Sequence, residues 1–148
     1  MTSKILIAVE DDYFSKQISA FLESHDWPGP VEFQVLHVVS PYPGVKPLQT
    51  ARELQELSWE IGGKLVNHAS KLIRNAVPKA TVTERLLEGD PREVIVDEAR
   101  SWQADMIVVG AHGQNKRPLY PLGSVSSVIA AYAPCSVLIV RKGKSGGK

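Results

Sequence analysis

The sequence predicts an α/β fold, an open five-stranded parallel sheet with helices on both faces. Five short apolar runs alternate along the chain with longer stretches whose apolar residues recur at helical spacing. The runs at residues 4–9 and 106–109 are apolar without alternation, as strands buried on both faces require. Strands that alternate with helices in one chain pair as a parallel sheet.

Length and composition indicate one globular domain at residues 1–141. The chain has 148 residues, of which 43% are hydrophobic, and the Gly/Lys-rich tail at 142–148 is expected to be disordered. The net charge of +1 gives no argument for nucleic acid or an anionic membrane as a partner. One cysteine, Cys135, excludes an intrachain disulfide, and no apolar stretch approaches the ~20 residues of a membrane span. We expect a cytoplasmic protein.

The first half of the chain reads as strand, helix, strand and loop. After the strand at 4–9, Asp12 is expected to cap a helix. The sequence Trp-Pro-Gly-Pro at 27–30 breaks the chain before a second strand at 32–39, and residues 40–47 form a loop. The apolar face of this first helix consists of Phe14, Ile18, Phe21 and Leu22.

A long helix is predicted from residue 48 to residue 76. Gly62 and Gly63 lie inside it at a cost of about 1 kcal/mol each relative to alanine, so a weak point or a close helix contact is expected there. Asp90 caps the next helix, with Pro91 as its first residue. That helix should bury Val94, Ile95, Ala99 and Trp102. The remaining elements are strands at 81–88, 106–109 and 136–140 and a helix at 124–132.

A glycine-containing loop joins the fourth strand to the last helix. Gly110 ends the strand and Gly123 precedes the helix, whose free N–H groups and the hydroxyls of Ser124 and Ser126 offer donors to an anion. The loop is a candidate phosphate cradle. It does not have the spacing of a dinucleotide fingerprint or of a P-loop. A Gly-Lys-Ser triplet at 143–145 has no helix after it.

The spacing of Gly110, Gly113, Gly123 and Ser124 resembles the nucleotide-binding signature of the universal stress protein family, in its ATP-binding branch. Residues 4–9, 36–39, 88–91 and 132–140 resemble further segments of that family, in the same order. The resemblance implies a Rossmann-like fold of the adenine nucleotide α-hydrolase type that binds ATP.

The carboxyl ends of parallel strands meet at one edge of a sheet, so three segments should converge there: residues 10–12, residues 37–40 and the Gly110 loop. The resemblance implies that Glu10, where relatives usually have aspartate, meets the base or ribose, and that the backbone of Val38 or Val39 meets the adenine. His37 is expected to be a packed side chain. Mg²⁺ is expected to offset repulsion between the carboxylates and the phosphates. The predicted nucleotide-binding residues are Ala8, Val9, Glu10, His37, Val38, Val39, Gly110, Ala111, His112, Gly113, Lys116, Arg117, Gly123, Ser124, Val125 and Ser126.

The insert between the second and third glycines has two open interpretations. Lys116 and Arg117 either screen the phosphates or are solvated charges, with equal weight. Pro118 and Pro121 disfavour a regular helix there, and the insert is also a candidate lid. His112, between two glycines, is expected close to phosphate.

The leading functional prediction is a nucleotide-dependent regulatory module in stress response, without catalytic residues. Ser124 lacks the G-x-S-x-G elbow of a nucleophile, and His112 has no evident orienting carboxylate. A slow ATP hydrolase or adenylate-handling enzyme and a nucleotide-free scaffold are the alternatives. The resemblance implies a homodimer through the last strand at Val137, Leu138, Ile139 and Val140, whose edge is open to pairing unless the tail covers it.

Overall fold

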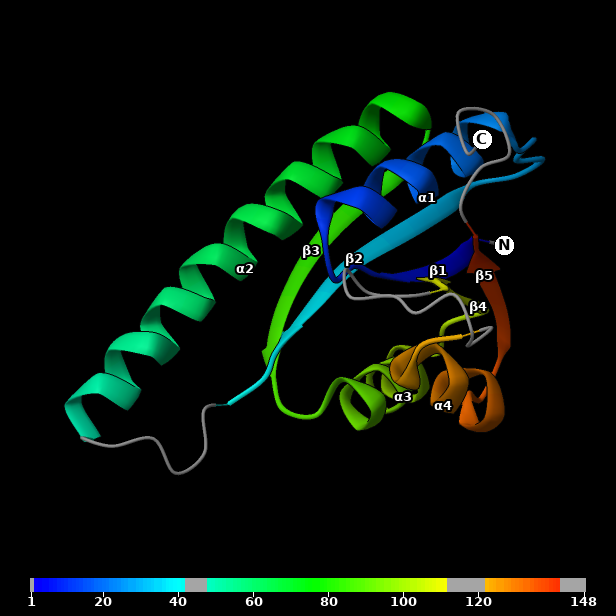
Figure 1. The fold of residues 1–148 in the computed structure, drawn as a ribbon. Helices are drawn as coiled ribbons and strands as arrows, with labels where there is room; N and C mark the ends of the chain where they lie inside the picture. The colour runs from blue at the N-terminus through cyan, green and yellow to red at the C-terminus, as the bar shows by residue number, and fades with distance from the viewer. Residues whose placement is uncertain (1, 42–47, 112–121, 142–148) are drawn as a thin grey trace, which may run out of the picture.

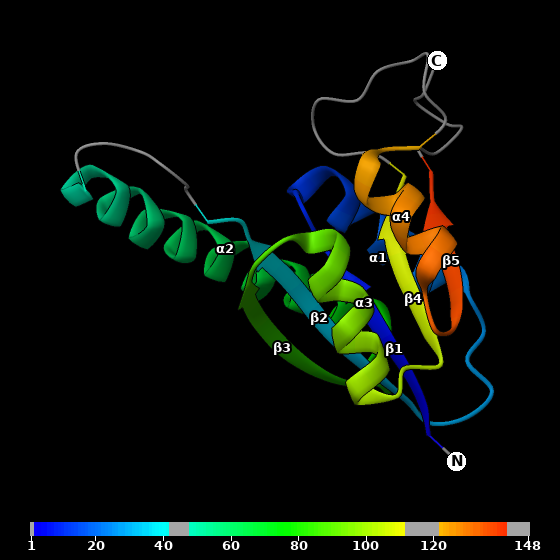
Figure 2. The ribbon, with the colours of Figure 1, turned by 90° about the horizontal axis from the view of Figure 1, so that it is seen from below.

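The computed structural model describes residues 2–41, 48–111 and 122–141. It confirms the predicted fold class: five parallel strands lie in the order β3-β2-β1-β4-β5, with two helices on each face (Figures 1 and 2). The elements are β1 (Ser3–Ala8), α1 (Asp12–Ser24), β2 (Val31–Val39), α2 (Leu48–Ala76), β3 (Thr81–Glu88), α3 (Pro91–Trp102), β4 (Met106–Gly110), α4 (Ser124–Tyr132) and β5 (Ser136–Val140). The predicted bounds differ from these by one residue at most. The predicted tail lies outside the described residues.

The central strand β1 separates two apolar cores. Ile5 and Ile7 belong to the core under α1 and α2, whereas Leu6 and Ala8 belong to the core under α3 and α4. Leu6 and Ile7 are completely buried, because helices cover both faces of the sheet. The uninterrupted apolar sequence of β1 follows from this double burial.

The cap of α1 is Asp11 and not Asp12, which corrects the sequence prediction. The Asp11 backbone is extended (φ −155°, ψ 171°), and its carboxylate Oδ1 accepts a hydrogen bond from the backbone N–H of Phe14 at 2.9 Å. The hydroxyl of Ser15 also donates to the Asp11 carbonyl oxygen at 2.7 Å. Asp12 is already the first helical residue, where its side chain is exposed. Phe14, Ile18 and Leu22 are buried as predicted, and Phe21 is half-buried.

The start of α3 agrees with the prediction, but its buried face does not agree fully. Asp90 accepts a hydrogen bond from Arg92 N–H, and Pro91 is the first helical residue. Ile95 and Ala99 are buried, together with Val96, which was not predicted. Val94 and Trp102 were predicted to be buried but are only half-buried. Helix α3 packs against α4 as well as the sheet, so its buried face is broader than one sheet-facing stripe (Figure 2).

Helix α2 has the predicted bounds and runs through its glycine pair without interruption. The second half of α2 buries the side chains of Val66, Ala69 and Ile73, whereas its first half extends past the sheet (Figure 1). A β-carbon at Gly62 would lie 2.9 Å from His37 Cδ2 and 3.1 Å from Leu86 Cδ1. The expected close contact is therefore with the sheet, because glycine lets α2 approach β2 and β3.

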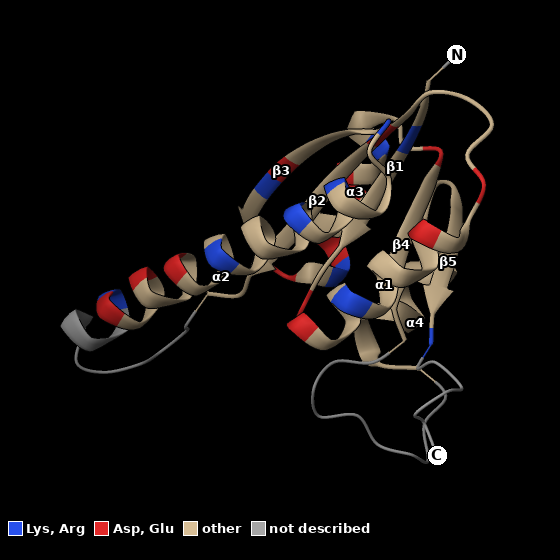
Figure 3. Ribbon diagram, turned by 90° about the horizontal axis from the view of Figure 1, so that it is seen from above, with Lys and Arg blue, Asp and Glu red and all other residues tan. Residues whose placement is uncertain are grey.

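Helix α2 does not present a surface of one charge. Basic and acidic residues are interspersed along α2 (Figure 3). In the described ranges, no helix is both long and apolar enough to cross a membrane.

Candidate functional site

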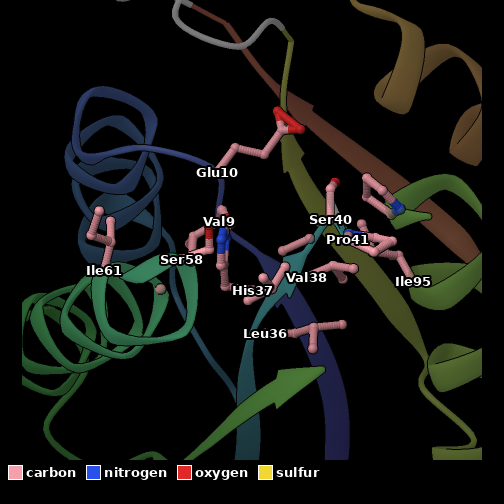
Figure 4. Close-up of a pocket in the computed structure, with 14 residues that line it drawn as sticks. Val9, Glu10, Leu36, His37, Val38, Ser40, Pro41, Ser58, Ile61 and Ile95 are labelled. Atoms are coloured by element: carbon pink, nitrogen blue, oxygen red, sulfur yellow. Dashed lines mark hydrogen bonds between the residues drawn. The ribbon is translucent and has the colours of Figure 1, made fainter. Parts of the chain in front are cut away.

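A pocket of about 490 Å³ lies at the carboxyl ends of β1 and β2, between α2 and α3 (Figure 4). It adjoins the point where strand order reverses, because β2 and β4 pair with opposite edges of β1. Ligands bind at such positions in open α/β sheets. The residues that line it are Ala8, Val9, Glu10, Leu36, His37, Val38, Val39, Ser40, Pro41, Ser58, Ile61, Gly62, Pro91 and Ile95.

Two helices supply walls that the sequence did not reveal. Ser58, Ile61 and Gly62 come from α2, and Pro91 and Ile95 come from the start of α3. Ile61 is 58% exposed and stands at this pocket (Figure 4). The glycine pair was the one sequence signal for the α2 wall, since a helix that carries glycine at its centre often allows a close approach.

His37 is packed, as predicted. Its side chain is half-buried, and Nδ1 lies 2.8 Å from the carbonyl oxygen of Val9 at the end of β1. The backbone N–H of Val9 donates in turn to the carbonyl oxygen of Leu36 at 2.9 Å. These two bonds tie the ends of β1 and β2 together beneath the pocket.

Of the three consecutive acids after β1, Glu10 alone lines the pocket. Its side chain extends from the end of β1 toward the end of β4 (Figure 4). Partial burial raises the pKa of the Glu10 carboxyl, and the neighbouring Asp11 carboxylate raises it further. Asp11 is occupied by the α1 cap, and Asp12 is exposed on the helix. A ligand hydroxyl that donates a hydrogen bond to this carboxylate would stabilise its charged form.

The β4–α4 connection forms a second part of the same sheet edge. The carbonyl oxygen of Ala111 accepts hydrogen bonds from Gly123 N–H at 2.7 Å and from the Ser126 hydroxyl at 2.9 Å. Gly123 is the N-cap of α4, and no side chain in the described part of the chain caps this helix. The first N–H groups of α4, from Ser124 and Val125, therefore lie outside the helical ladder and attract anions.

Ser126 does not have the predicted role of a free hydroxyl donor. The residue is 3% exposed, and its hydroxyl donates to a backbone carbonyl within the protein. Its position two residues inside α4 turns it toward Ala111, so it fastens the start of the helix to the end of β4. Ser124 is exposed and remains available to a ligand.

Gly110 is required by packing against α1. A β-carbon at this position would lie 2.5 Å from Phe14 Cγ, closer than real β-carbons come to any atom. The sequence interpretation assigned this glycine to the approach of a ligand, and the structure adds a reason that is independent of any ligand.

The structure brings Ala8, Val9, Glu10 and the end of β2 into one pocket and sets Gly110 and Ala111 at the same edge of the sheet. His112, Gly113, Lys116 and Arg117, and with them the proposed lid, lie outside the described residues. Within the ranges that the structure covers, no group of three or more His, Cys, Asp or Glu side chains could hold a metal ion.

Comparison with known proteins places this chain in a family. The model of the universal stress protein family matches residues 1–141. The chain belongs to the universal stress protein family. A universal stress protein of Thermus aquaticus is 29% identical over 141 residues, which cover 95% of this chain and all of that protein.

Solved universal stress proteins share the fold. UspA from Lactobacillus plantarum superposes with a TM-score of 0.76 at 21% identity, over 94% of this chain and 97% of that one. The universal stress protein from Archaeoglobus fulgidus, solved in complex with dAMP, superposes with a TM-score of 0.63 at 24% identity, over 93% and 97% of the two chains. At these identities the likeness shows the architecture of this universal stress protein.

Proposed function

We propose that this universal stress protein binds an adenine nucleotide, ATP, at the carboxyl edge of its sheet. The observation that carries the proposal is the pocket of about 490 Å³ at the ends of β1 and β2. Its volume is within the range of small-molecule sites, and its walls are mostly apolar with a few polar groups, as a nucleobase requires. The dAMP complex of the Archaeoglobus fulgidus relative supports the same ligand class.

The polar groups support one orientation of the nucleotide. In this proposal the base lies against Val38 and Val39, the ribose lies near Glu10, and the phosphates extend toward the uncapped N-terminus of α4. Phosphate contacts would come from the backbone of Gly110, Ala111 and Gly123 to Val125, the Ser124 hydroxyl, and His112, Gly113, Lys116 and Arg117 of the insert. Mg²⁺ would offset the repulsion between Glu10 and the phosphates.

The role proposed for bound ATP is regulation. Nucleotide occupancy would bias the conformation of a cytoplasmic homodimer that pairs through β5. Support for this interface comes from the sheet order, since β5 is an edge strand that pairs with β4 alone in the described part of the chain. Sedimentation velocity should show a dimer, and Ile139→Lys should shift it to monomer. A wild-type monomer at micromolar concentration would overturn the interface.

The experiment on the ligand combines chromatography of nucleotide released from the gently purified protein with calorimetric titration by Mg-ATP. Gly123→Val should weaken binding at least about tenfold, which is about 1.4 kcal/mol. The backbone at Gly123 (φ −74°, ψ 171°) suits any residue, so the variant should fold while its side chain blocks the phosphates.

Gly29→Val is the matched control, because nothing lies within 4 Å of a β-carbon there and the residue precedes β2 at the opposite end of the sheet. Equal affinities of the two variants would refute the phosphate assignment. Wild-type protein that neither carries nor binds nucleotide would leave the scaffold alternative. Conversion of bound ATP to ADP in a single-turnover assay would instead favour slow hydrolysis.

A further inference from the structure

The imidazole ring of His37 is held from two sides at the pocket wall. Its Nδ1 lies 2.8 Å from the carbonyl oxygen of Val9, and its Cδ2 faces Gly62 so closely that a β-carbon there would be 2.9 Å away. The ring therefore has one orientation between β1 and α2. The part that neither contact occupies is the Cε1–Nε2 edge.

The Val9 contact fixes the position of the ring proton. A backbone carbonyl only accepts hydrogen bonds, so Nδ1 must be the donor and must carry the hydrogen. In the neutral imidazole Nε2 then has a free lone pair and can only accept. No hydrogen bond joins Nε2 to another residue in the described ranges.

The environment of the ring is mostly apolar. Val9 and Val39 are each 3% exposed and line the pocket with His37, and Ile61 stands on the α2 side. Nε2 is therefore an acceptor in a wall that is mostly apolar, with Ser58 as the polar residue on the α2 side. An acceptor in such a wall strongly favours a ligand that brings a donor to it, because a ligand without one leaves the nitrogen unpaired.

We propose that His37 Nε2 accepts a hydrogen bond from the exocyclic amine of bound adenine and so selects 6-amino purines. This inference rests on the proposed nucleotide site. The adenine amine is a donor, whereas the 6-oxygen of hypoxanthine or guanine is an acceptor that would face the lone pair. The mostly apolar walls around His37 suit a base, whereas Glu10 and the start of α4 provide the polar groups for ribose and phosphate.

The test compares AMP with purine riboside 5′-monophosphate, which has hydrogen in place of the amine. Wild-type protein should bind AMP about tenfold more tightly in calorimetric titration, and His37→Asn should reduce that preference to near parity. Asparagine can still donate from its amide to the Val9 carbonyl oxygen, but it has no atom at the Nε2 position. Its unfolding midpoint should therefore stay close to that of the wild type.

Gly62→Ala and Gly63→Ala are a matched pair for the position of the ring. Both replace a glycine inside α2, but a β-carbon at Gly63 meets only Leu86 Cδ2, at 4.0 Å. Gly62→Ala should displace the imidazole and reduce the preference for AMP, and Gly63→Ala should keep it. Nitrogen-15 NMR of the ring should show a protonated Nδ1 and a bare Nε2 whose signal moves when AMP is added.

The outcomes separate the two proposals. A tenfold preference that persists in His37→Asn, or a ring protonated at Nε2 instead of Nδ1, would overturn the role of His37 while the nucleotide site stands. Equal binding of both ligands by the wild type would do the same. A wild type that binds neither ligand would overturn the nucleotide site itself.

Discussion

Phe14 occupies the space that a side chain at residue 110 would need, since a β-carbon there would lie 2.5 Å from Phe14 Cγ and 2.8 Å from its Cβ. The first helix thus packs directly on the end of β4. Gly110, the first glycine of the nucleotide-binding signature, is therefore needed for packing. Its replacement should change the stability of the fold whether or not a ligand is bound.

Gly110→Ala should lower the free energy of unfolding by about 1–3 kcal/mol, because the ring and the β4 backbone must move apart. Urea denaturation measures the change. Gly29→Ala, where a β-carbon meets nothing within 4 Å, should be close to neutral. Phe14→Leu should cost less in the Gly110→Ala background than in the wild type. Equal stability of the two alanine variants would show that α1 adapts freely.

Asp11→Ala should destabilise the protein by about 1 kcal/mol, because it leaves the Phe14 N–H without its acceptor. Asp12→Ala should cost only a few tenths, since Asp12 contributes only through the helix dipole. Thermal unfolding of the two variants under identical buffer conditions distinguishes the caps. A larger loss for Asp12→Ala would reverse the assignment.

Two buried serines, Ser19 on α1 and Ser70 on α2, should respond in opposite directions when they are replaced by alanine. The Ser70 hydroxyl on α2 is fully buried and has no hydrogen-bond partner in the described structure, so Ser70→Ala should stabilise by about 1 kcal/mol. The Ser19 hydroxyl on α1 donates to the Leu72 carbonyl oxygen at 3.1 Å, so Ser19→Ala should destabilise by about the same amount. Chemical denaturation gives both values, and a destabilised Ser70→Ala would indicate a buried water at that hydroxyl.

Glu10→Gln should change the pH dependence of stability. Burial, with Asp11, raises the pKa of Glu10 above its ordinary value of 4.5, so the folded protein holds this proton more tightly than the unfolded chain. The stability that protonation adds is full below about pH 4.5 and is lost as the pH rises through the raised pKa. Glutamine does not titrate.

The difference in unfolding free energy between Glu10→Gln and the wild type should therefore grow in favour of the variant from about pH 4 to about pH 7. Solvent contact at Glu10 keeps this difference modest. Urea denaturation across that pH range measures it. A constant difference between the two proteins would contradict the raised pKa.

The helices and strands could be predicted because each depends on a local sequence pattern, which is helical spacing for the helices and an uninterrupted apolar run for a buried strand such as β1. The apolar residues of α2 recur at helical spacing over all 29 of its residues, which sets its bounds. The cap of α1 could not be assigned from sequence, since Asp11 and Asp12 have the same chemistry and the choice depends on the extended backbone at Asp11. One residue of difference decides which carboxylate reaches the Phe14 N–H.

The pocket was predictable only in part, because some of its walls depend on tertiary packing. Ala8, Val9 and the end of β2 follow from strand order, because parallel strands end at a common edge. Ser58 and Ile61 do not follow, since the turn of α2 that faces the pocket depends on how that helix crosses the sheet. The sequence singled out both Gly62 and His37 but not the contact between them, because His37 lies 25 positions earlier in the chain.

One carbonyl oxygen, that of Ala111, accepts the hydrogen bonds that join the end of β4 to the start of α4. The Ala111 carbonyl oxygen accepts hydrogen bonds from Gly123 N–H and from the Ser126 hydroxyl one turn later, so the two ends of the segment between β4 and α4 are joined directly. Each doubling of a loop's length costs only about 0.6 kcal/mol in closure entropy. We therefore expect that segments of different length can be transplanted here from relatives while the sheet and α4 keep their junction.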